Sequence, residues 1–168
     1  MAYVLETRDH RGMPLRRYNI DAVVGRNPRA RNLKLDVKLV QVLLKIFYYE
    51  LGGRSDSGTR FEPPAIGGGD IAVDGIHGPV TQAHIDTFLD QLRKYETEPI
   101  NNDHGFDPMS RKSGGLVVHG RRVYLVALVW LNDYCFRGDG LRSMPLEARS
   151  DIVPVDLAAA LSKVYRIG

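Results

Sequence analysis

Two segments of the chain carry apolar residues at helical spacing, which predicts two helices. The first covers 36–51, and we expect Asp36 to cap it by accepting a backbone N–H. Gly52-Gly53 follow it and suit the left-handed conformation that ends many helices. The second begins at Gly78-Pro79, where proline suits the first turn, and runs to about Tyr95. The two apolar faces hold Val37, Val40, Leu44 and Phe47, and Ile85, Phe88, Leu89 and Leu92.

The N-terminal pattern is typical of a β-hairpin. Strand-like segments at 2–7 and 15–24 flank residues 9–14, which are rich in turn formers. A polar, basic link covers 25–34. Residues 52–70 and 96–120 are rich in glycine and polar residues and predict long loops, with a brief strand at 116–118.

The C-terminal third predicts two further helices. Residues 121–137 contain an apolar run, Val123 to Leu131, for which a buried strand is the competing interpretation. Its length and the polar residues that follow favour a helix, ended by Gly138. A last helix is expected from Val155 or Asp156 to about Tyr165. Together these elements predict one mainly α domain over 1–168.

Composition narrows the class of protein. Hydrophobic residues make up 43% and charged residues 26%, as in globular proteins. A net charge of +3 is too balanced to predict nucleic acid as a partner. The single cysteine, Cys135, excludes an intrachain disulfide framework. With no secretory signal and no apolar run near the ~20 residues of a membrane span, we expect a cytoplasmic chain that does not insert into membranes.

The residues between the two predicted helices form a turn with a physical rationale. Asp74 can accept bonds from backbone N–H groups across it, and Gly75 and Gly78 allow positive φ or close approach. Pro79 opens the second helix, and Thr81 can bond back toward the loop. Such a turn holds two helices in a fixed relation, with a shallow groove between them.

Both segments resemble a known family. Asp36-Val37-x-x-Val40-Gln41-x-Leu43-Leu44 and Val73-Asp74-Gly75-Ile76-His77-Gly78-Pro79-x-Thr81 resemble the peptidoglycan-binding domain found beside many cell-wall hydrolases. The family pairs a V-Q-x-L-L helix with a D-G-x-aromatic-G-x-x-T turn, and here His77 occupies the aromatic position. The match covers about a third of the chain. Residues 24–27 followed by Asp36-Val37 also resemble a variant associated with type VI secretion and related contractile systems.

The resemblance implies a peptidoglycan-binding-like helical bundle over 33–95. The hairpin and link at 1–32 would precede this core, and a loop and helical extension at 96–168 would follow it. It also implies recognition of peptidoglycan or a muropeptide in the groove beside the turn. Aromatic rings stack on sugars and arginines pair with carboxylates, so the candidate ligand contacts are Tyr48, Tyr49, Arg54, Arg60, Phe61 and His77. For Tyr48 and Tyr49, packing between helices is an equally good interpretation.

No catalytic or metal-binding pattern emerges, so neither a metal nor another cofactor is expected. There is no H-E-x-x-H motif, and we interpret His77 as filling the aromatic position and His84 as a surface group. Cys135 lies near the end of an apolar helix and is interpreted as a core residue, not a nucleophile. No spacing selects a pair of carboxylates for glycoside hydrolysis.

Three functions follow as expectations. The first is non-catalytic peptidoglycan binding. The second is a structural or adaptor role in a contractile injection or phage-tail-like assembly, with the same fold making protein contacts. The lack of a signal favours this role, since a cytoplasmic chain meets peptidoglycan only if a non-Sec route exports it. A cell-wall hydrolase with an unfamiliar site in 96–168 ranks third.

Overall fold

The computed structural model describes residues 1–8, 12–55, 57–66, 69–96, 99–100, 103–119, 121–137 and 145–167. Of these residues 37% are helical and 18% lie in strands, so the expectation of a mainly α fold is wrong and the protein is mixed α/β. The described elements are β1 (Tyr3–Arg8), β2 (Pro14–Asn19), β3 (Val24–Gly25), α1 (Lys34–Lys45), a π-helical turn (Ile46–Glu50), α2 (Pro79–Tyr95), β4 (Gly105–Phe106), β5 (Leu116–His119), β6 (Arg122–Leu125), α3 (Ala127–Arg137), a 3₁₀ turn (Leu146–Ala148), α4 (Val155–Leu161) and β7 (Val164–Arg166).

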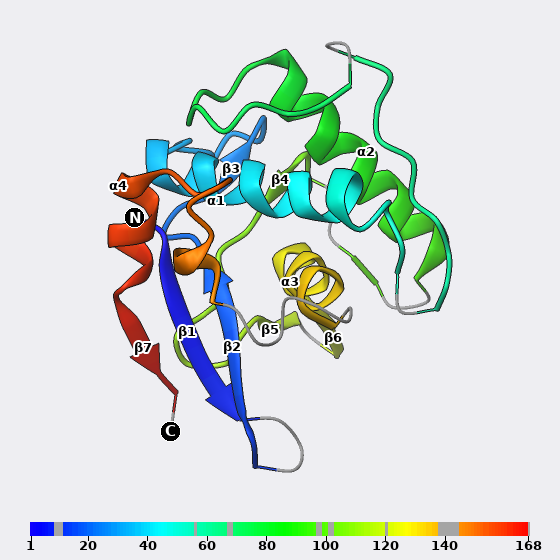
Figure 1. Cartoon of the computed structure of the whole chain (residues 1–168). Helices are drawn as coiled ribbons and strands as arrows, with labels where there is room; N and C mark the ends of the chain where they lie inside the picture. Colours follow the sequence, from blue (N-terminus) through cyan, green and yellow to red (C-terminus); the bar gives the residue numbers. More distant parts are fainter. Residues whose placement is uncertain are drawn as a thin grey trace.

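The predicted N-terminal hairpin is confirmed. β1 and β2 pair antiparallel from Tyr3↔Asn19 to Arg8↔Pro14. The second arm ends earlier than expected, because Val24 leaves the hairpin and pairs with Phe106 in the small β3–β4 sheet. In Figure 1 the hairpin extends below the body of the molecule. Helix α1 crosses the middle, and α2 lies above it and to its right.

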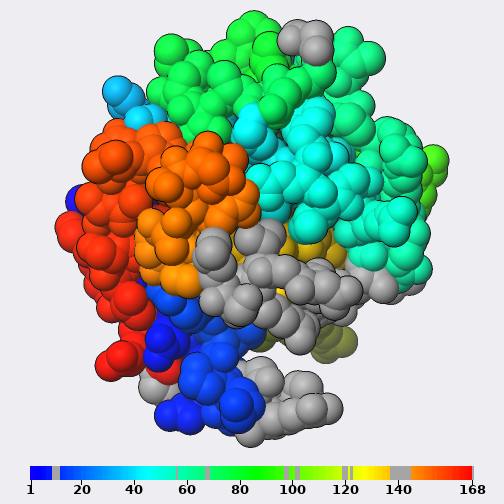
Figure 2. Space-filling model, in the orientation of Figure 1, coloured from blue at the N-terminus to red at the C-terminus, as the bar shows by residue number. Residues whose placement is uncertain are grey.

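The last predicted helix ends at Leu161, and the residues expected to continue it form strand β7. β7 pairs parallel with β1 (Val4↔Val164), giving a sheet of order β2-β1-β7. Two flanking bonds extend this pairing, from Val4 N–H to Lys163 O and from Ile167 N–H to Glu6 O, both at 2.9 Å. Because β1 is buried along its first half, its second edge needs backbone partners, and β7 supplies them. Figure 2 shows this C-terminal segment, residues 145–167, against α1 on one face.

Helix α1 begins at Lys34, two residues before the predicted start, and Asp36 does not cap it. The N-cap is Leu33, which makes no side-chain cap bond. The Asp36 carboxylate is fully buried and instead accepts the backbone N–H groups of Asp21 (3.2 Å) and Ala22 (3.1 Å). This helix start therefore anchors the chain that leaves β2.

The C-terminal end of α1 widens into the π-helical turn, marked by a 2.9 Å bond from Leu51 N–H to Ile46 O. The helical segment stops at Gly52 and Gly53, as predicted, with φ of +66° and +68°. At Gly53 a Cβ would lie 2.0 Å from Phe61 O, so the returning loop at this point requires glycine.

The segment 121–137, predicted as one helix, is part strand and part helix. Its first half is β6, which pairs with β5 (Val118↔Val123), and α3 starts only at Ala127. The expected strand at 116–118 is thus confirmed as part of β5. Pairing between the two apolar stretches explains why the helix does not start at 121. Gly138, the predicted stop, lies outside the described residues.

A single apolar cluster joins α1, α2, α3 and the sheet. Its centre is a set of aromatic rings with centroids 5.3–5.8 Å apart: Phe47, Phe61, Phe88, Phe106 and Tyr134. Cys135 is fully buried beside them, as expected of a core residue, and burial raises its pKa well above the ordinary value. None of the helices in the described ranges combines the length and apolarity needed to cross a membrane.

Candidate functional site

The turn between α1 and α2 is organised by one buried glutamine, Gln41, in the middle of α1. Its two Nε2 hydrogens are shared among three acceptors, Asp74 Oδ1 (2.9 Å), Thr81 Oγ1 (3.0 Å) and Ile76 O (3.2 Å). Its Oε1 accepts the N–H of Gly75 (2.9 Å). One side chain thereby ties the start of the turn and the start of α2 to α1. A buried, fully bonded amide of this kind makes the turn rigid.

The predicted roles of Asp74 and Thr81 are confirmed. Asp74 Oδ1 accepts the N–H of Ile76 at 2.8 Å, and Thr81 Oγ1 donates to Ile76 O at 3.3 Å. Partial burial raises the pKa of Asp74, but the bonds from Ile76 N–H and Gln41 outweigh it and hold the pKa below the ordinary value. The carboxylate therefore stays ionised in the turn.

The two turn glycines differ. Gly75 has φ of +78°, and a Cβ there would lie 2.7 Å from Lys34 Cγ and 2.9 Å from Lys34 O. Gly78, by contrast, is extended (φ −117°) with open space around it, so it uses neither the positive φ nor the close approach that we expected glycine to allow there. It is the N-cap of α2, and Pro79 is the first helical residue as predicted.

A pocket with a volume of about 290 Å³ opens beside this turn. The loop before the turn forms one wall, the start of α2 forms the other, and Gln41 lies between them. Its lining is Gln41, Asp70, Ile71, Ala72, Asp74, Ile76, Gly78, Pro79, Val80 and Thr81. Ile76 is 65% exposed at the mouth of this pocket, in the turn that Gln41 ties to α1.

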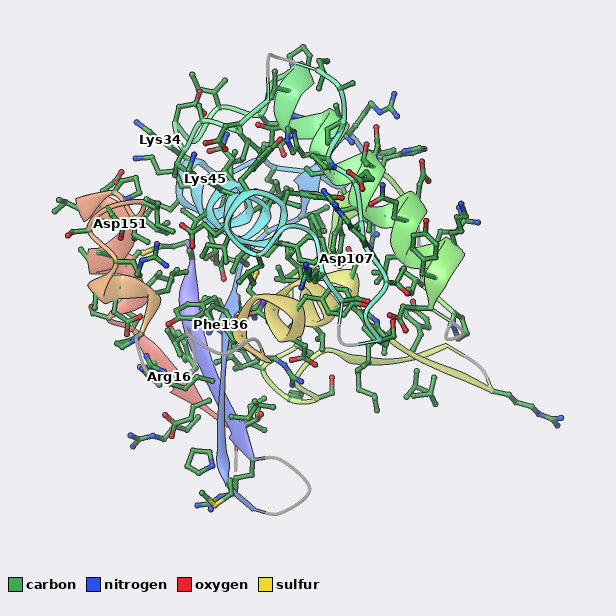
Figure 3. The ribbon with its side chains drawn as sticks, turned by 45° about the vertical axis from the view of Figure 1, so that its right-hand side comes forward. Arg16, Lys34, Lys45, Asp107, Phe136 and Asp151 are labelled. Carbon is green, nitrogen blue, oxygen red and sulfur yellow. The ribbon has the colours of Figure 1, made fainter. Side chains whose placement is uncertain are left out.

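The loop wall is tied back to the first helical segment at two points. Lys45, near the end of α1 (Figure 3), forms an ion pair with Asp70, and the Tyr49 hydroxyl donates to Gly69 O. Tyr49 also contacts His84 on α2, with 2.7 Å between its hydroxyl and Nε2. His84 is fully buried, so its interpretation as a surface group is wrong. Burial lowers the pKa of His84, against the opposing effects of the Val80 carbonyl and Asp70.

None of the six predicted ligand-contacting residues lines this pocket, and only Tyr49 and His77 lie near it. Tyr48 and Phe61 are buried in the aromatic core, and Tyr48 donates to Gln91 at 3.3 Å. Neither ring is free to stack on a sugar. Tyr49 is half-buried behind the loop wall, and His77 lies on the turn, where Nε2 is 2.7 Å from Gln82 Oε1.

Arg54 and Arg60 are exposed and face each other across a small bridge in the 52–66 loop, and Arg60 pairs with Glu62 at 3.1 Å. Neither arginine lines the pocket. Six of the ten lining residues were not predicted as site residues from the sequence: Gln41, Asp70, Ile71, Ala72, Ile76 and Val80. The sequence does contain a sign of Ile76: it is a large aliphatic residue within a turn, and turn residues are expected to be exposed.

In the described part of the chain, no three histidine, cysteine or acidic residues gather in a way that could hold a metal ion. Beside the pocket, the Tyr49 hydroxyl contacts the His84 ring, and neither residue is part of the lining. The pocket residues among those described thus present hydrogen-bonding and apolar groups, which suit binding.

The resemblance to the peptidoglycan-binding domain rests on the two quoted segments. No protein-family model matches this chain, and neither a curated protein nor a solved structure matches it.

Proposed function

We propose that the protein binds peptidoglycan fragments without catalysis, in the pocket beside the Asp74–Thr81 turn. The observation that carries this proposal is an open pocket with an exposed isoleucine, Ile76, on a turn that Gln41 holds rigid. A concave pocket with apolar walls and a few convergent polar groups, held by a preorganised turn, is the usual form of a ligand site. The family resemblance of the same residues supports the choice of partner.

The pocket chemistry fits a muropeptide. Muropeptides combine methyl groups, on N-acetyl and alanyl units, with amide N–H groups and a free ammonium. Apolar walls from Ile71, Ala72 and Val80 suit the methyl groups, and the oxygens of Asp70 and Asp74 can accept N–H donors. A preorganised pocket also lowers the entropic cost of binding.

The proposal is tested by titrating soluble muropeptides into the protein by calorimetry and by retention on purified sacculi at low salt. Ala72→Phe fills the pocket from an exposed position and should weaken binding at least about 10-fold. The matched control is Ala65→Phe, an exposed loop alanine outside the lining, which should bind like the parent. Equal binding by both variants, or no retention of the parent, contradicts the proposal. Release of soluble muropeptides would show catalysis instead.

A second candidate, an adaptor in a contractile assembly, is favoured by the β5–β6 hairpin. Leu116, Val118 and Val123 on this hairpin are 44%, 66% and 52% exposed, an apolar surface away from the pocket. Figure 3 shows the hairpin extending outward from α3. The test is co-purification with sheath, tube or spike proteins encoded beside the chain, and its loss in Val118→Asp. Unchanged co-purification of that variant would contradict a role for the hairpin in adaptor contacts.

A further inference from the structure

A line of hydrogen-bonding groups connects the two walls of the pocket behind its lining. On the α2 side, His84 Nδ1 lies 2.8 Å from Val80 O, and Val80 lines the pocket. In the middle, His84 Nε2 lies 2.7 Å from the Tyr49 hydroxyl. On the loop side, that hydroxyl bonds Gly69 O, next to the lining residue Asp70. Figure 1 shows the first helical segment, which carries Tyr49, beside α2.

The donors and acceptors along this line determine which atoms of His84 and Tyr49 carry protons. Both ends are carbonyl oxygens, which only accept. His84 must therefore carry a proton on Nδ1, and Tyr49 must direct its one proton to Gly69 O. The middle contact then needs a proton on Nε2, which exists only when His84 is the doubly protonated cation. When His84 is neutral, the Tyr49 hydroxyl can donate its proton either to Nε2 or to Gly69 O, but not to both.

We infer that His84 and Tyr49 are positioning residues that couple the two pocket walls, and that protonation of His84 completes the link to Gly69. The coupling between the walls is a property of the chain alone. Its effect on ligand affinity rests on the proposed function. Acidification would hold the 69–72 wall in place more firmly, and a neutral His84 would release it.

The groups that face His84 determine the pH at which its ring gains the second proton. The π-helical turn presents the Tyr48 and Tyr49 rings, and the loop presents Asp70, which is itself paired with Lys45. Burial disfavours the cation, and the Asp70 charge and the Val80 carbonyl favour it. The net direction is a pKa below the ordinary histidine value, so His84 is neutral near pH 7 and gains its proton on acidification.

The experiment is an NMR titration of the full chain from pH 8 to pH 4.5, following the His84 ring nitrogens and the backbone amides of residues 69–73. At pH 8 we expect the Nδ1–H tautomer of His84. On acidification, the protection factors of the amides at 69–73, corrected for the intrinsic pH dependence of exchange, should rise about two- to ten-fold, with the same midpoint as the His84 titration. Tyr49→Phe should keep the titration of His84 and lose the response of the loop.

His84→Gln should also lose the response. His77→Gln is the matched control, because His77 lies on the turn just before α2 and its ring bonds Gln82 rather than Tyr49. An Nε2–H tautomer at pH 8, or a loop response that does not follow His84, would overturn the inference. Muropeptide affinity measured over the same pH range separates the two proposals. If the loop responds to His84 but no muropeptide binds at any pH, only the proposed function is contradicted. If muropeptides bind but the loop does not respond to His84, only this inference is contradicted.

Discussion

Gly75 meets Lys34 from α1 so closely that a single added methyl group has nowhere to go. Its φ of +78° adds a conformational cost for any residue with a side chain. We expect Gly75→Ala to lower the free energy of unfolding by about 1–3 kcal/mol in urea denaturation. Gly78→Ala, in the same turn but extended and open, should cost less, within about 1 kcal/mol, which is the usual difference between glycine and alanine at an N-cap. Equal losses would contradict this account of the turn.

Residue identity alone did not separate ligand-contacting side chains from core side chains. Tyr48 and Tyr49 are neighbours of the same type, and the π-helical turn buries one and leaves the other half-buried near the pocket. Phe61 follows a glycine-rich loop, as a ligand-contacting residue would, but it packs on Phe47 and Phe88. Whether an aromatic ring is free depends on which elements cover it, and that information is not local.

At the scale of elements, one side chain lets helix α3 dock on the edge of strand β2. Asn132 Oδ1 accepts the N–H of Tyr18 (2.7 Å), and its Nδ2 donates to Tyr18 O (3.0 Å). The amide thus replaces a neighbouring strand at this position, and both residues are buried.

Asn132→Ala should lower the free energy of unfolding by about 2–4 kcal/mol, because it leaves two buried backbone groups of Tyr18 unpaired. Asn132→Asp keeps the acceptor and loses the donor, and should also destabilise the protein, less so at low pH where the carboxyl can donate. Thermal and urea denaturation measure both. A loss below about 0.5 kcal/mol for Asn132→Ala would show that water replaces the amide.

At the scale of the whole molecule, an ion pair joins α1 to α4. Lys38 Nζ contacts both carboxylate oxygens of Asp156 (2.8 and 2.7 Å), with the two side chains 10% and 49% exposed. The Lys38 hydrogen bond is the main cause of a lowered Asp156 pKa. Because the folded pKa lies below the unfolded one, this contribution is present above about pH 4 and is lost as the pH falls through the folded pKa.

Asp156→Asn should therefore cost about 1 kcal/mol or less at pH 7, and the difference from the parent should vanish as the pH falls through the lowered pKa of Asp156. Urea denaturation at several pH values measures it. Glu62→Gln is the matched control, since its partner Arg60 is exposed and that pair should contribute little at any pH. A difference that persists unchanged at low pH would rule out the ion pair as its source.

By itself, the sequence determined the elements whose stabilising contacts are close together along the chain. The β1–β2 hairpin, the helical segments beginning near 36 and at Pro79, and the bonds of Asp74 and Thr81 all follow from periodicity and turn chemistry. Only the tertiary structure decided the elements whose partners are distant. Residues 164–166 form a strand because they pair with the second edge of β1. Asp36 accepts backbone N–H groups from the segment after β2 instead of capping its own helix. His84 is buried because three separate elements meet around it, which no local pattern records.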